Sequence, residues 1–568
     1  MRIILHLKHL CLLIFASVAI LLVRPPKLQS ENMAMVDSLL HSYYETSARN
    51  TLDKAFITLE QLRNKEIEKN LIAGMHESNV RQVNNILQRY NELTAKMNRL
   101  RSRNQTRLSA DSVDVYESEI NEFKNNVIHR FPAYTFFFST IDSLPLKFVQ
   151  TKIIHEKQAI INYAVYGRHI HALVTSRDSA HAVILPGNAD DIVRSMRELV
   201  TPLYSAKNPK KLTFNKDIAY ALYQQLFEPL EKHLSNIESI VIIPDKKIWG
   251  LPFEALIQTP MIQKNDATSI LYGEFRNVDF LIKKYAIAYS ASVVGLSTQL
   301  TNVYPRPGRG RKLLTMSGVA IVPDTFDPWC NYYATENQAL VDQEIHRISQ
   351  RMWRHENMID TQATETNLVS NNHAFRWIHL ALPAVFYTDS PAQSYVGFAS
   401  DSTTKAYTKL HMGDIITSEL PTDQVILSRS AVYMPADSIG TAIAALPQSL
   451  LLSGVRSVIW SRWLSNGTTI TRFMSKFYWE LKYKRQTNML ALQQAKLAAL
   501  RDSFVFDEVE ISSAHPYFWA SYVLIGNTHI RPPTFSTIPP YMVIVIVYVV
   551  VILVALIIVR KTVDTNRE

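Results

Sequence analysis

The sequence predicts an α/β protein in which a helical region precedes the sheet and a membrane-spanning helix follows it. Three observations predict this class. After residue 150, short apolar runs alternate with amphipathic stretches, as in an open, mainly parallel sheet with helices on both faces. Residues 31–145 follow a helical period, and residues 541–559 carry no charged side chain. With 568 residues, 47% of them hydrophobic, the chain is long enough for a large core.

The N-terminus has the pattern of a secretory signal. Arg2 and Lys8 precede an apolar stretch, "LCLLIFASVAILLV", at residues 10–23. We assign residues 1–30 to a signal peptide or to an uncleaved signal anchor, because no convincing small-residue cleavage site follows the apolar stretch. Both alternatives place the following residues outside the cytoplasmic membrane.

Residues 31–145 are expected to form a helical, coiled-coil-like region. Its clearest apolar stripe alternates steps of three and four residues, at Val83, Ile86, Tyr90, Leu93, Met97 and Leu100. The stripe is shorter than three heptads, which favours a helical hairpin within the chain over an oligomeric coiled coil. The candidates for the partner helix are Leu52, Phe56, Leu59 and Leu62.

Residues 150–530 carry the expected sheet. The run "IINYAVYGRHIHALVTS", at 160–176, and "HAVILP", at 181–186, have the texture of a small antiparallel set. Wholly apolar runs follow, as in strands buried on both faces of a parallel sheet. They include "IESIVIIPD", "FRWIHLAL", "QVILSRS" and "VRSVIWSRW".

The C-terminus predicts a transmembrane helix at residues 541–559, "YMVIVIVYVVVILVALIIV". At ~1.5 Å per residue this run nearly crosses a hydrocarbon core of ~30 Å. Arg560 and Lys561 follow it directly, and basic flanks favour the cytoplasmic side. We therefore expect a cytoplasmic tail at 560–568, location in the cell (cytoplasmic) membrane, and an extracytoplasmic or periplasmic main body.

Charge and cysteine content exclude several classes of partner. The net charge is +10, and two basic clusters contribute to it, at Arg99, Arg101, Arg103 and Arg107 and at Arg306, Arg309, Arg311 and Lys312. Neither cluster is interleaved with aromatic residues, so we read them as solvated loops and expect no nucleic acid partner. Cys11 and Cys330 are the two cysteines, and no metal site or cofactor is expected from them.

Several motifs resemble one family. "IVIIPDKKIWGLPFEALI", at 240–257, resembles the signature of the CHAT domain, a caspase-like peptidase domain. Further stretches resemble the family in the same order: "LIKKYAIAYSASVVGL", "SGVRSVIWSRWLSNGTTITRFMSKFYWEL", "ALQQAKLAAL" and "HPYFWASYVLIGN". The resemblance covers roughly 150–530 and implies a caspase-like α/β/α sandwich. It implies a non-catalytic half at 150–300 and a peptidase-like half at 310–530.

The resemblance also locates an altered catalytic site. Active relatives use a Cys–His dyad, with the histidine and the cysteine at the ends of neighbouring strands. In this sequence "HLALPA" puts Pro383 at the histidine position and "LSRS" puts Ser430 at the cysteine position. Proline has no titratable group, and a serine hydroxyl without a base is a poor nucleophile.

Other residues of this region are candidates for pocket positions, namely His379, Ser428, Arg429 and Trp463. His379 lies four residues before Pro383, ~13 Å away along a strand, too far to serve Ser430 as a base. The sequence therefore predicts a membrane-anchored pseudopeptidase that binds a protein or peptide or acts as a scaffold. The alternatives are an active peptidase that uses Ser430 with an unrecognised base, and a purely structural assembly subunit.

Overall fold

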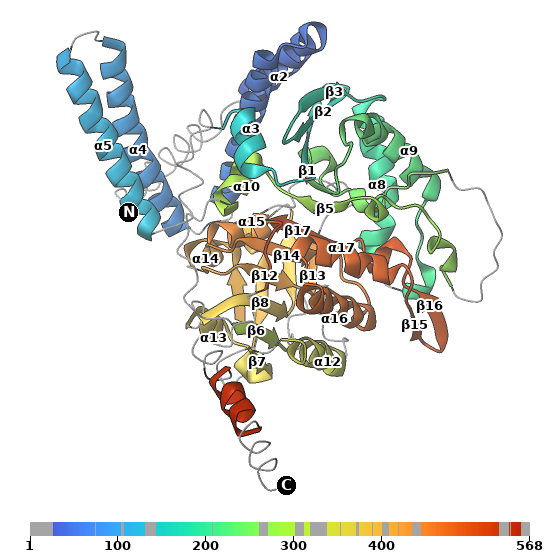
Figure 1. Ribbon diagram of the computed structural model, residues 1–568. Helices are drawn as coiled ribbons and strands as arrows, with labels where there is room; N and C mark the ends of the chain where they lie inside the picture. The colour runs from blue at the N-terminus through green and yellow to red at the C-terminus, as the bar shows by residue number, and fades with distance from the viewer. Residues whose placement is uncertain are drawn as a thin grey trace, which may run out of the picture. The chain divides into compact units, whose positions relative to one another are not determined.

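The computed structural model describes most of the chain (Figure 1). The described residues are 26–532, with gaps at 74, 76, 104–106, 131–143, 207, 261–270, 301–311, 319–337, 353, 371–373, 389, 400–407, 419 and 434–444, and then 545 and 547–557. Most of the predicted signal region and the whole predicted cytoplasmic tail, 560–568, lie outside them.

The body of the protein is built on one mostly parallel sheet, as its apolar runs predict. Eleven described strands form it in the order β3-β2-β1-β4-β5-β17-β14-β12-β8-β6-β7. Their bounds are β1 Gln158–Tyr166, β2 His169–Ser176, β3 Ala180–Ile184, β4 Ser239–Ile243, β5 Ala286–Tyr289, β6 Lys312–Ser317, β7 His355–Ile359, β8 Phe375–Ala381, β12 Gln424–Leu427, β14 Ser457–Ser461 and β17 Tyr522–Gly526.

Antiparallel pairing is confined to two places in this sheet. β1, β2 and β3 pair antiparallel at one edge, which agrees with the expected small antiparallel set. β17 runs antiparallel to β14, so the last strand of the sheet inserts between its two halves. The remaining neighbours are parallel, and their strands are largely buried because helices cover the sheet, except for the edge strand β7, in which Met358 alone is buried.

Two groups of helices pack on the sheet (Figure 1). One group contains α12 (Gln338–Ser349), α16 (Gly467–Tyr483) and α17 (Asn488–Ala499), which contact one another in that order. The other contains α10 (Val293–Leu300), α14 (Met412–Thr417) and α15 (Ala445–Leu452), together with α3 (Arg49–Ala73) of the helical region. Further helices in the described part of the body are α7 (Leu146–Phe148), α8 (Ala189–Ser205), α9 (Lys216–Leu226) and α13 (Glu365–Ser370).

The helical region forms two pairs of helices. α2 (Pro26–Thr46) packs on α3 (Arg49–Ala73), and α4 (Glu77–Arg103) packs on α5 (Arg107–Arg130). The predicted hairpin within the chain is therefore present. α3 is also a partner of α4, because its Ile67 and Leu71 share a core cluster with Val83, but the four residues suggested for that contact do not belong to this cluster. Leu52 and Phe56 of α3 belong instead to a core cluster with Ile160 of β1 and Val241 of β4. The sheet competes for the apolar stripe of α3 because it offers a larger apolar surface to bury.

A buried carboxylate ties α3 to the body. Glu60 is 1% exposed, accepts a hydrogen bond from Asn162 at 2.9 Å, and accepts one from the backbone N–H of Val293 at 2.7 Å. Val293 is the first residue of α10, so the carboxylate meets the positive end of that helix. The helical region and the sheet therefore share one core.

The expected C-terminal transmembrane helix is wrong. No helix of the described residues is long and apolar enough to cross a membrane. The expected membrane location rested on this helix and is withdrawn with it.

Candidate functional site

The carboxyl ends of β8, β12 and β14 lie side by side in the middle of the sheet. Leu427 of β12 pairs with Leu380 of β8 on one side and with Trp460 of β14 on the other. Parallel neighbours end at the same edge, so the residues after these strands gather there. The structure thus brings together the positions that the resemblance assigns to the dyad.

At this edge the chain continues into a second sheet. β9 (Ala384–Tyr387) follows β8 directly, and β13 (Ser430–Tyr433) follows β12. They pair parallel, with Ser430 opposite Ala384, in a four-stranded sheet that is completed by β10 (Tyr395–Phe398) and β11 (Thr408–His411). Pro383 precedes β9 and its carbonyl accepts a hydrogen bond from Gly397 at 2.8 Å. Both dyad positions therefore lie at or beside a paired strand.

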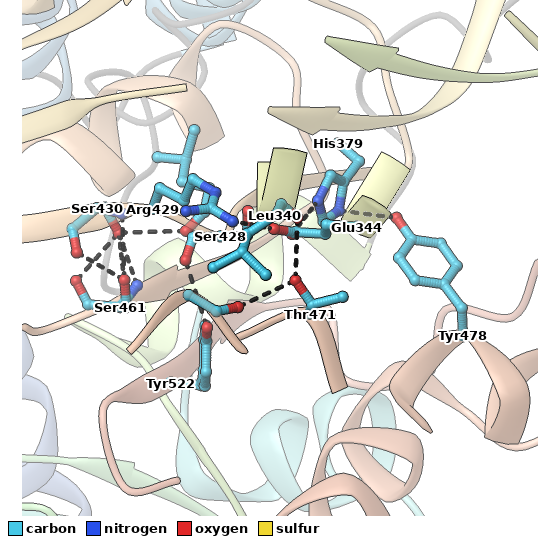
Figure 2. A network of polar contacts seen from close by, with 12 residues as sticks. Leu340, Glu344, His379, Ser428, Arg429, Ser430, Ser461, Thr471, Tyr478 and Tyr522 are labelled. Carbon is cyan, nitrogen blue, oxygen red and sulfur yellow. Dashed lines mark hydrogen bonds and ion pairs between the residues drawn. The ribbon is translucent and has the colours of Figure 1, made fainter. Parts of the chain in front are cut away.

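Ser430 is held in a reciprocal set of hydrogen bonds with Ser461, the last residue of β14 (Figure 2). Its Oγ accepts from the Ser461 N–H at 2.7 Å and lies 3.0 Å from the Ser461 carbonyl oxygen. In return, the Ser461 Oγ donates to the Ser430 carbonyl oxygen at 2.6 Å and lies 3.2 Å from the Ser430 N. Both hydroxyls are buried, at 0% and 1% exposed. They bridge β13 and β14, which belong to different sheets.

His379 belongs to a separate buried network on the same strands (Figure 2). Its Nε2 lies 2.9 Å from Oε1 of Glu344 on α12, and its Nδ1 lies 3.2 Å from the hydroxyl of Tyr478 on α16. The other Glu344 oxygen accepts from Arg429 at 2.9 Å. His379 and Glu344 are 0% exposed and Arg429 is 1% exposed, so the network is closed to solvent.

The charge of Glu344 is stabilised by its partners. Burial alone raises the pKa of a carboxyl group, but the Arg429 guanidinium and the His379 hydrogen bond outweigh it and lower the pKa of Glu344 to about 2. Burial and the nearby Glu344 charge raise the pKa of Tyr478 well above its ordinary value. His379 therefore pins α12 and α16 to β8, and in the register of the sheet it lies opposite Ile426, not opposite Ser430.

The two remaining candidate residues are also interior. Ser428 is 0% exposed, its N–H donates to the Leu380 carbonyl, and its own carbonyl accepts from the hydroxyl of Tyr522 at 3.3 Å. Trp463 is 2% exposed and donates from Nε1 to the Tyr517 carbonyl at 2.9 Å. All four candidate pocket residues are thus surrounded by protein atoms.

The comparisons with known proteins identify the family. Residues 216–527, more than half of the chain, match the CHAT domain family. The chain belongs to the CHAT domain family. This confirms the resemblance that the sequence motifs indicate, and the matched region contains the two dyad positions and their surroundings.

Solved structures similar to this CHAT domain chain share little sequence with it. The Saccharomyces cerevisiae separase–securin complex matches in one crystal structure with 9% identity over 85% of this chain and 34% of that chain, at a TM-score of 0.42. A second structure of that complex matches with 10% identity over 87% of this chain and 37% of that chain, at a TM-score of 0.39. The Arg-specific cysteine proteinase gingipain R matches with 11% identity over 61% of this chain and 75% of that chain, at a TM-score of 0.31. The chain thus spans about a third of the separase chain. No curated protein matches the sequence.

A second charged cluster of this CHAT domain was not predicted. Glu254 lies within the family signature and is fully buried; it binds the Lys496 ammonium at 2.6 Å and accepts from the hydroxyl of Tyr289. Arg462, directly after β14, lies 3.7 Å from the same carboxylate. Burial raises the pKa of Glu254, but the two cations outweigh it and lower the pKa. The sequence did contain a signal for this cluster. One charged residue lies inside each of two otherwise uncharged motifs, "GLPFEAL" and "LQQAKLAAL".

The described residues offer no grouped metal ligands. No set of three or more His, Cys, Asp or Glu side chains gathers among them in a way that could hold a metal ion.

Proposed function

We propose that this CHAT-domain protein is a pseudopeptidase that binds a protein or peptide partner without cleaving it and acts as a scaffold. The single observation that carries the proposal is that the Ser430 hydroxyl is buried and already hydrogen-bonded. Its hydrogen-bond partners are Ser461 and the Leu427 carbonyl.

The proton chemistry of Ser430 supports this proposal. A serine attacks an amide only when a neighbouring base removes its proton. The groups that contact the hydroxyl within the described part of the chain are amides, carbonyls and one other hydroxyl, and none of them accepts a proton near neutral pH. The imidazole of His379 is held by Glu344 and Tyr478. Pro383, at the position of the family's histidine, supplies no base.

The geometry around the hydroxyl supports the same proposal. A nucleophile must meet a substrate carbonyl at ~3 Å in an accessible cleft. Ser430 is instead the first residue of β13, and β9 lies beside it. The chain keeps the family's sheet but has no activated nucleophile at Ser430. This supports peptide binding in place of peptide hydrolysis, because binding by backbone pairing and side-chain pockets needs no nucleophile.

A hydrolysis assay tests the proposal. We expect the full-length protein to leave an unfolded protein substrate and a fluorogenic peptide library intact, with the same background rate in the Ser430→Ala variant. The same protein should retain a subset of peptides on an array. Cleavage that disappears in Ser430→Ala would establish the alternative, a serine-dependent peptidase. Neither cleavage nor retention would favour the purely structural subunit.

A further inference from the structure

A pocket lies on the outer side of the body, away from the dyad positions. It has a volume of about 430 Å³ and opens between α16, α17 and the segment that follows α17. Phe473, Phe518 and Ala495 are buried side chains that line it, and Ala498 and Ala499 leave space because they are small. This volume falls in the range of ~300–1,000 Å³ typical of small-ligand pockets. One large apolar side chain would fit against this lining.

The rim of the pocket is basic. Arg472, Lys476 and Arg501 line it, against the single carboxylate of Asp502. Arg472 is paired with Asp502 at 3.1 Å, and Lys476 is paired with Glu480 at 2.6 Å. Arg501 is exposed and forms no ion pair with any residue that the structure describes. The rim therefore keeps unneutralised positive charge.

The basic surface continues along α16 with two aromatic side chains. We define the α16 face as Arg472, Lys476, Trp479 and Tyr483, which recur at helical spacing on the outer side of the helix. Lys476 lies 4.2 Å from the centre of the Trp479 ring, and the Trp479 and Tyr483 rings are 5.7 Å apart. Tyr483 is 56% exposed. Exposed aromatic residues among cations are typical of protein interaction surfaces.

We propose that the α16 face and its pocket bind an acidic segment of a partner protein, with one apolar anchor side chain of that segment in the pocket. Positive charge on the rim complements the acidic residues, and the apolar lining buries the anchor. Lys484 and Arg485 extend the positive charge beyond the C-terminal end of α16. A basic surface around an apolar pocket gives both attraction at long range and specificity at the anchor.

The same surface fits a peptide better than a nucleic acid. Stacking of successive bases needs a series of open aromatic faces, whereas one face of the Trp479 ring is occupied by Lys476. The apolar part of the pocket, formed by Phe473, Phe518 and the alanines, would bury an aliphatic or aromatic side chain, which a phosphate backbone does not offer.

This inference rests on the proposed function, since it names the surface through which a non-cleaving scaffold binds its partner. The test uses the full-length protein and a short fluorescein-labelled peptide in which glutamates surround a single leucine. Fluorescence anisotropy should show saturable binding that weakens as salt is raised. We expect the Arg501→Glu/Lys484→Glu variant to weaken binding about tenfold, because it reverses two exposed charges. The Ala498→Phe variant, which fills the pocket, should weaken binding of the leucine peptide to the level of its alanine analogue.

Lys152→Glu is the matched control, because Lys152 is an exposed lysine on a π-helical turn, outside the α16 face. It should leave the affinity unchanged. Equal losses in Lys152→Glu and in the double variant would overturn the assigned surface, as would absence of saturable binding or equal affinity for the leucine and alanine peptides. If a single-stranded RNA of the same length bound more tightly than the leucine peptide, the proposal of a protein partner would be overturned. Cleavage of the probe, seen as anisotropy that decays with time, would instead reject the proposed function.

Discussion

The buried carboxylate Glu344 offers the sharpest test of how this site is held together. In Glu344→Gln the shape of the side chain is kept, but the charge that faces Arg429 at 2.9 Å is lost. Removal of one partner of a buried ion pair leaves the other charge unpaired in a low-dielectric interior, which costs about 3–5 kcal/mol of unfolding free energy. We expect a loss of this size at pH 7.

The pKa of Glu344 gives an independent magnitude. It falls from an ordinary value of 4.5 to about 2 in the folded protein. At about 1.4 kcal/mol per pKa unit, this difference corresponds to about 3 kcal/mol of unfolding free energy. The pKa is depressed by folding, so the stabilisation is present above pH 4.5 and is lost as the pH falls toward 2. About 2 kcal/mol of it should be lost by pH 3.

Urea denaturation followed by tryptophan fluorescence measures both effects, since the chain contains eight tryptophans. The wild-type protein should lose stability more steeply than Glu344→Gln between pH 6 and about pH 3. Glu228→Gln is the control, because Glu228 is exposed, and it should change stability by less than about 0.5 kcal/mol. If Glu344→Gln matched the wild type at pH 7, or if the two lost stability in parallel on acidification, the assignment of Glu344 as a charged structural anchor would be refuted.

Three further predictions concern the contacts of Ser430 and of Glu60. Ser430→Ala should lower the unfolding free energy by about 1–3 kcal/mol, because it leaves the Ser461 N–H without its acceptor; an unchanged denaturation midpoint would contradict the bridging role. The double variant Pro383→His/Ser430→Cys should gain no peptidase activity against a fluorogenic peptide library, since position 430 is buried beside β9; measurable turnover would show that the dyad residues alone were missing. Glu60→Ala should lower the unfolding free energy by about 3 kcal/mol in a denaturant titration, because Asn162 and the Val293 N–H lose a buried acceptor, whereas the exposed Glu45→Ala should have little effect.

The networks around Glu344 and Glu254 share one design. In each, a buried carboxylate binds a cation and one further polar side chain. Glu344 contacts Arg429 and the imidazole of His379, and Glu254 contacts Lys496 and the hydroxyl of Tyr289. Arg462 comes directly after β14, and Arg429 comes two residues after the last residue of β12. Charges that are fully paired in this way hold helices in a defined register on the sheet, and they are costly to disturb singly.

Local patterns determined much of this protein. Apolar runs such as residues 375–381 and 424–427 form strands at the predicted places, because a strand buried on both faces needs an uninterrupted apolar sequence. The family motifs predicted the CHAT assignment, which the family match confirms. The placement of the altered dyad positions at "HLALPA" and "LSRS" stays a prediction. The helical period of residues 83–100 likewise predicted α4.

Tertiary structure decided what those patterns contact. The sequence shows that Ser430 lacks a cysteine's chemistry, but only the pairing of β13 with β9 and the bond to Ser461 show that its hydroxyl is occupied. Likewise the apolar residues of α3 could face α4 or the sheet, and the structure shows that they face both. Among the residues that the structure describes, no helix is long and apolar enough to cross a membrane, contrary to the expectation from the C-terminal apolar run. The physical reason is that composition and period set what a segment buries, whereas the partner that covers it depends on residues far away in the chain.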